Sequence, residues 1–110
     1  GKAAFLDVNV TFTHPKVKPQ AGQTLVTALY YTDVKGVSVA SLTPAMRINT
    51  ELTEEYVSKG LRISLEPVDR TVSAMYVLLW VDQNADGQLG EGELAAYNCS
   101  YETKRGNTFA

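Results

Sequence analysis

The longest run of apolar residues, from Ala74 to Val81, most limits what this chain can fold into. A membrane-spanning helix needs roughly 18 or more apolar residues, so this run is too short to cross a bilayer. It is rich in the aromatic and β-branched residue types that favour strands, and both of its faces are apolar near its end. Such a strand must be covered on both sides. We therefore predict a strand from Thr71 to Val81 at the centre of a sheet.

Alternation of apolar and polar residues predicts further strands. In segment 5–12, Leu6, Val8 and Val10 alternate with polar residues, which is typical of a strand with one buried face. The last predicted strand places Ala95, Tyr97, Cys99 and Tyr101 on one face. This last strand spans residues 94–103. The pattern also predicts strands over residues 24–32, 37–42 and 61–65.

Turn-forming residues separate these strands. Two prolines and a glycine indicate a loop over 14–22, and residues 32–36 have turn chemistry. Segment 46–60 leaves two interpretations open: a short helix with Thr53 as its N-cap and Gly60 as its end, or the rim of a sandwich. Residues 104–107 have the composition of a frayed tail.

The length and strand pattern together predict the fold class. A chain of 110 residues corresponds to one domain, residues 1–110. About seven short strands with turns between them predict an all-β protein. We expect an antiparallel β-sandwich of the immunoglobulin or prealbumin type.

The composition argues against several functions. A formal net charge of −2 provides no basic excess for binding nucleic acid or anionic membranes. One cysteine cannot form an intrachain disulfide. A nucleophilic Cys99 would need a histidine, and His14, the only one, lies in a proline-rich loop. We therefore expect a protein that is not an enzyme.

One segment, Asp82 to Glu93, matches the calcium-loop pattern D-x-[DN]-x-[DN]-G-x5-E in full. Calcium is a hard cation that prefers six to eight oxygen ligands. An ordinary EF-hand loop joins two helices, whereas a predicted strand leads into this loop and another leaves it. We therefore expect EF-hand-like ligation between two strands of a sandwich.

The spacing of the motif assigns a role to each ligand. Asp82, Asn84 and Asp86 would present side-chain oxygens, Gln88 its backbone carbonyl, and Glu93 both carboxylate oxygens. Within the same loop, Gly87 would permit the sharp bend, Leu89 would anchor the loop to the core, and Gly90 would leave its coordination position to water. Without a cation, the acidic residues of this loop would repel one another.

Two other interpretations of the loop are weaker. Gly87, Gly90 and Gly92 suggest a phosphate cradle, but the neighbouring carboxylates would repel phosphate. Glu91 and Glu93 suggest the acid and base of a glycosidase. Metal binding already accounts for this part of the loop, so we do not favour a glycosidase.

Strand 76–81 running into D-x-N-x-D-G and then G-E resembles the final hairpin of bacterial cell-surface β-sandwich domains of the prealbumin-like and adhesin B-repeat group. The resemblance covers about the last third of the chain. It implies that the calcium loop is structural and that the protein is secreted or located in the cell envelope. The sequence contains no secretory leader, so export would require one that this sequence does not include.

These observations lead to two functional hypotheses. The first is a calcium-stabilised structural or adhesion-type module, with a protein or glycan partner at the cell surface. The second is a carbohydrate-binding module in which Tyr30, Tyr31, Tyr97 and Tyr101 form an exposed platform for sugar rings. An exposed coplanar pair of tyrosine rings would favour the second hypothesis, and buried tyrosines would favour the first.

Overall fold

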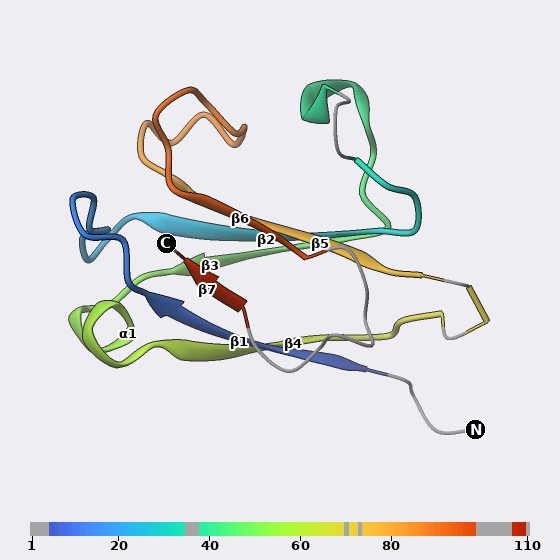
Figure 1. Ribbon diagram of the computed structural model, residues 1–110, viewed down its shortest axis with the longest axis horizontal. Coiled ribbons are helices and arrows are strands. Elements are labelled where there is room, and N and C mark those ends of the chain that lie inside the picture. The colour runs from blue at the N-terminus through green and yellow to red at the C-terminus, as the bar shows by residue number, and fades with distance from the viewer. Residues whose placement is uncertain (1–4, 35–37, 70, 73, 99–106, 110) are drawn as a thin grey trace.

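The strands form two sheets that pack face to face as a β-sandwich (Figure 1). The computed structural model describes residues 5–34, 38–69, 71–72, 74–98 and 107–109. One sheet has the order β4-β1-β7 and the other the order β3-β2-β5-β6. The strands are β1 (Leu6–Phe12), β2 (Thr24–Tyr30), β3 (Met46–Glu51), β4 (Leu61–Leu65), β5 (Tyr76–Asp82), β6 (Ala95–Asn98) and β7 (Asn107–Phe109). The predicted all-β sandwich is confirmed.

Strand β1 buries one face, as its alternating sequence predicts. Leu6, Val8 and Val10 are buried in the core between the sheets. Strand β1 pairs antiparallel with β4, so that Val8 lies opposite Ile63. Alternation therefore determines both the face that β1 buries and its register with β4.

Strand β5 lies between β2 and β6, so the predicted central strand is confirmed. All residues of β5 after Tyr76 are buried. The strand begins at Tyr76 and not at Thr71, which corrects the predicted start. The Asp69 carboxylate accepts hydrogen bonds from the backbone N–H of Thr71, at 2.9 Å, and from its hydroxyl, at 2.6 Å. This turn holds Thr71 outside the sheet.

The predicted strand over Val37–Leu42 is wrong at residues 38–42, and Val37 lies outside the described residues. Residues Val39–Ser41 form a 3₁₀ turn, η1, in which the Ser41 backbone N–H donates to the Ser38 carbonyl. The Ser41 hydroxyl donates to the same carbonyl at 2.7 Å. These local bonds occupy a backbone group that a strand would need for pairing. The apolar residues that suggested a strand instead pack onto a sheet, as described below.

Segment 46–60 contains two elements: strand β3, which the sequence pattern did not predict, and the short helix, one of the two interpretations left open. Helix α1 spans Glu54–Lys59. The Thr53 hydroxyl accepts the Tyr56 backbone N–H at 3.1 Å, which makes Thr53 the predicted N-cap. Gly60 ends the helix, and its N–H donates to the Tyr56 carbonyl at 2.8 Å.

The C-terminal part of the chain departs from the expected tail. Strand β7, which begins at Asn107, pairs parallel with β1, so the predicted tail is wrong at that residue. This pairing satisfies backbone groups on the edge of β1 opposite β4. Residues 99–106, which include Cys99, Tyr101 and the rest of the expected tail, lie outside the described residues.

The core has two parts, on opposite faces of the four-stranded sheet. The larger part lies between the two sheets. The second part, which we call the outer core, lies on the face of the four-stranded sheet that points away from the other sheet. Its buried residues are Val26, Ala28, Tyr30, Val34, Leu78 and Trp80. Segment 38–45 and loop 82–93 supply Val39, Leu42 and Leu89, which pack against these residues.

Gly60 provides a test of how α1 is joined to the sandwich. Its backbone has φ 87° and ψ 179°, a conformation found almost exclusively at glycine, and a Cβ there would lie 2.5 Å from the Val10 carbonyl oxygen. Gly22 also has positive φ, 95°, but has nothing within 4 Å of a Cβ. We expect Gly22→Ala to lower the free energy of unfolding by about 1–2 kcal/mol and Gly60→Ala to lower it by more. Chemical denaturation measures both, and equal losses would contradict the predicted backbone clash.

Candidate metal centre

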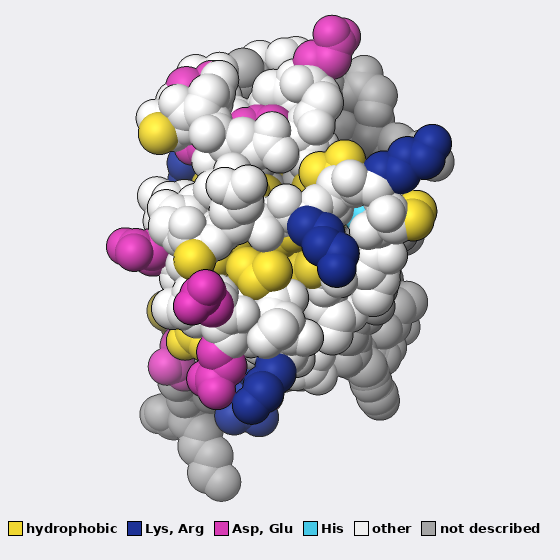
Figure 2. Space-filling view, turned by 90° about the vertical axis from the view of Figure 1, so that its left-hand side faces the viewer, with side chains coloured by type: hydrophobic (Ala, Val, Ile, Leu, Met, Phe, Trp, Pro, Cys, Tyr) yellow, Lys and Arg dark blue, Asp and Glu magenta, His cyan; other side chains and the backbone are white. Residues whose placement is uncertain are grey.

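Loop 82–93 joins β5 to β6, so the expectation that it connects two strands is confirmed. Gly87 has φ 77°, which provides the bend expected at that position. Leu89 packs against the outer core, as predicted for a loop anchor. Figure 2 faces the end of the molecule from which this loop projects and shows acidic side chains along its upper edge.

Asp82 organises the first half of the loop. It is the last residue of β5, and only 6% of its surface is exposed. One carboxylate oxygen accepts the Gly87 backbone N–H at 2.7 Å, and the other accepts the Asp86 N–H at 3.3 Å. The carboxylate of Asp82 therefore holds the bend of the loop against the end of β5.

Asp86 and Asn84 lie beside this bend and are exposed. The Asp86 carboxylate accepts the Gln88 backbone N–H at 2.9 Å and the Asn84 side-chain amide at 3.3 Å. The hydrogen bond from Gln88 is the main cause that lowers the pKa of Asp86 below its usual value. Asp86 is therefore ionised at neutral pH.

Glu93 closes the loop from its other end. One carboxylate oxygen accepts the Gly90 N–H at 2.6 Å, and the other accepts the Gln83 N–H at 2.7 Å. The carboxylate thus bridges the start of the loop and the turn that precedes Glu93. Both oxygens that were expected to bind calcium carry a backbone hydrogen bond in this structure.

The predicted ligands therefore lie in one loop but in two groups. Asp82, Asn84 and Asp86 are linked to one another around the bend, whereas Glu93 is bonded to Gln83 and Gly90. No group of three or more His, Cys, Asp or Glu side chains in the described part of the chain is arranged to hold a metal ion. The donor set suits calcium chemically, because it consists of carboxylate, amide and carbonyl oxygens.

Sequence reasoning missed one residue at this site. The Arg47 guanidinium, on β3, donates from Nη2 to the Gly87 carbonyl oxygen at 2.8 Å. The same guanidinium lies 5.6 Å from the centroid of the Trp80 ring. Arg47 is separated from the loop by forty residues in the sequence. No local pattern signals such a contact, because it depends on the pairing of β3 with β2.

The described tyrosines that the carbohydrate-binding hypothesis would need on the surface are engaged in contacts within the protein. Tyr30 is buried in the outer core, and the half-buried Tyr31 accepts the Asp69 backbone N–H at 2.9 Å. Tyr97 is half-buried and stacks on Tyr76 at 6.3 Å between ring centroids. Each of these rings packs against the protein itself. Tyr101 lies outside the described residues.

The remaining candidate groups are also placed. The imidazole Nδ1 of His14 accepts hydrogen bonds from the backbone N–H groups of Lys16, at 3.1 Å, and Val17, at 3.0 Å, so this histidine stabilises its own loop.

No helix within the described ranges is long and apolar enough to cross a membrane. Comparison with protein-family models, with curated proteins and with solved structures finds no match to this chain.

The hydrogen bonds of Asp82 predict that it stabilises the fold even without metal. In EDTA, Asp82→Ala leaves the Asp86 and Gly87 N–H groups without their acceptor, so we expect a loss of about 1–3 kcal/mol in the free energy of unfolding. Glu91→Ala is the matched control, because Glu91 is an exposed acid of the same loop. We expect its effect to stay within about 0.5 kcal/mol. Equal effects in urea denaturation would refute the role of Asp82 as an organiser of the loop.

Proposed function

We propose that this chain is a non-enzymatic structural or adhesion-type module whose last hairpin is stabilised by one calcium ion in loop 82–93. The observation that carries the proposal is Asp82, buried at the end of β5 with both carboxylate oxygens turned onto the loop backbone. In EF-hand-like ligation the first acid of the loop both binds the ion and orders the bend.

The ligands would be the side chains of Asp82, Asn84, Asp86 and Glu93 and the backbone carbonyl of Gln88. When bound, calcium would neutralise the carboxylates that crowd this loop. Glu93 is the ligand that has to move, because its carboxylate bonds to Gln83 and Gly90 and not to the group around Asp82. Binding would therefore draw the two halves of the loop together and join the ends of β5 and β6.

The resemblance to bacterial surface domains supports a secreted or cell-envelope location, with a protein or glycan partner at the cell surface. The described tyrosines support this choice over carbohydrate binding, because Tyr30 is buried and the half-buried Tyr31 and Tyr97 are held by a hydrogen bond and a ring contact within the protein. A calcium ion that stiffens a surface hairpin also agrees with the absence of a helix pair that calcium could open, within the described residues.

Calcium should raise the melting temperature of the EDTA-treated protein. A site filled at 100 times its dissociation constant adds about 2.7 kcal/mol to the free energy of unfolding. Extracellular calcium modules often bind in the range of about 10⁻⁴–10⁻³ M, so the titration should extend to about 100 mM calcium. Thermal unfolding followed by circular dichroism measures the increment.

Two variants test whether the calcium-induced rise in stability comes from loop 82–93. Glu93→Gln should abolish most of the calcium-induced increment, whereas Glu91→Gln, which changes a neighbouring exposed acid by the same chemistry, should keep it. Each variant is compared with its own EDTA baseline, because Glu93→Gln also weakens two backbone hydrogen bonds. A wild-type protein with no increment, or one that Glu93→Gln leaves intact, would refute calcium ligation by this loop.

A further inference from the structure

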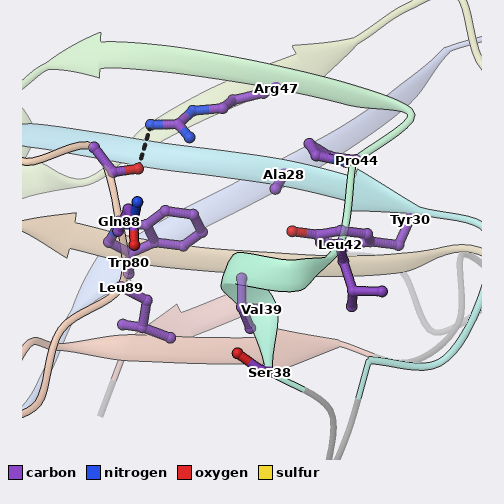
Figure 3. Close-up of a pocket in the computed structure, with 11 residues that line it drawn as sticks. Ala28, Tyr30, Ser38, Val39, Leu42, Pro44, Arg47, Trp80, Gln88 and Leu89 are labelled. Atoms are coloured by element: carbon purple, nitrogen blue, oxygen red, sulfur yellow. Dashed lines mark hydrogen bonds between the residues drawn. The ribbon is translucent and has the colours of Figure 1, made fainter.

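A cavity of about 370 Å³ opens on the outer core, between η1 and loop 82–93 (Figure 3). Ala28, Tyr30 and Trp80, from β2 and β5, form its floor. The apolar side chains at its walls are Val39, Leu42, Pro44 and Leu89. This volume lies at the lower end of the range for small-molecule sites, about 300–1,000 Å³.

The floor carries a polar group without a partner. Only 2% of Trp80 is exposed, and its indole N–H makes no hydrogen bond to any described residue. A buried N–H without an acceptor is unfavourable, and native proteins rarely leave one in that state. Because this nitrogen is itself fully buried, Trp80 meets the cavity through other atoms of the residue, which adds to the apolar floor.

The rim carries a positive charge that no carboxylate in the described ranges neutralises through an ion pair. Arg47 lies over the Trp80 ring, and Figure 3 shows its guanidinium beside the loop (dashed line to Gly87). It donates to the Gly87 carbonyl and to Asn49 Oδ1, at 3.2 Å, which leaves further N–H groups of the guanidinium available. The charge of Arg47 also acts on Tyr30 in the floor of the cavity. Burial raises the pKa of Tyr30, and the nearby positive charge of Arg47 partly opposes that rise.

We infer that this cavity binds a small aromatic carboxylate. The ring would lie against the apolar walls, and the carboxylate would contact Arg47 at the rim. The apolar walls disfavour a sugar, whose hydroxyl groups would need more polar partners than the cavity has. The inference does not rest on calcium, since none of the residues it uses is a proposed calcium ligand.

The test uses phenylacetate and the signals of Trp80, the only tryptophan of the chain. Its indole N–H is therefore a single resonance in a ¹H–¹⁵N NMR spectrum. We expect phenylacetate to shift this resonance saturably, in the micromolar to millimolar range typical of so small a ligand. Phenylacetamide, which lacks the charge, and acetate, which lacks the ring, should bind about tenfold more weakly or worse. Titrations in EDTA and in calcium separate this site from the calcium proposal.

Arg47→Gln should weaken phenylacetate binding by about tenfold or more, because a charged hydrogen bond is lost, and should leave phenylacetamide binding unchanged. Arg47→Lys keeps the charge and should restore part of the affinity. Arg62→Gln, an exposed arginine of β4 on the other sheet, is the matched control and should have no effect. Three results would overturn the inference: no saturable shift with phenylacetate, equal binding of phenylacetamide, or stronger binding of methyl glucoside.

Discussion

Strands β2 and β5 are apolar on both faces, and the rest of the molecule is arranged to cover them. Their inner faces pack into the core between the sheets, as in any sandwich. Their outer faces carry Val26, Tyr30 and Trp80, which water would solvate poorly. Residues 38–45 and loop 82–93 therefore lie over the four-stranded sheet, and Val39, Leu42 and Leu89 pack against these side chains. This second layer is the physical reason why two connections of a small domain are packed onto the sheet.

The same requirement joins the proposed metal loop to the proposed cavity. Loop 82–93 covers the outer core with Leu89 and exposes Asp86 and Glu91 to solvent. Its bend is held by Asp82 from within and by Arg47 through the Gly87 carbonyl. A ligand bound to Arg47 and a cation bound in the loop would therefore both affect the backbone at Gly87.

The sequence pattern predicted those elements whose structure is decided by residues close together in the chain. The alternation in β1, the apolar run in β5 and the cap at Thr53 each reflect interactions within a few residues or with one buried face. Predictions failed where a competing interaction decided the structure. Val39 is of a residue type that favours strands, but it lies in a 3₁₀ turn closed by a hydrogen bond between Ser41 and Ser38. Asn107 was expected in a tail but begins β7, because the edge of β1 is available for pairing.

For the candidate site, the sequence alone supplied the proposed donors and their order: Asp82, Asn84, Asp86, Gln88 and Glu93 stand at the spacing of the calcium-loop pattern. It also determined that the chain would form an all-β sandwich, because strand periodicity is a local property. Only the tertiary structure decided that Glu93 bonds to Gln83 and Gly90, that Arg47 reaches Gly87, and that a cavity lies over Trp80. These features depend on how distant strands align, and a one-dimensional pattern contains no distance between residues far apart in the chain.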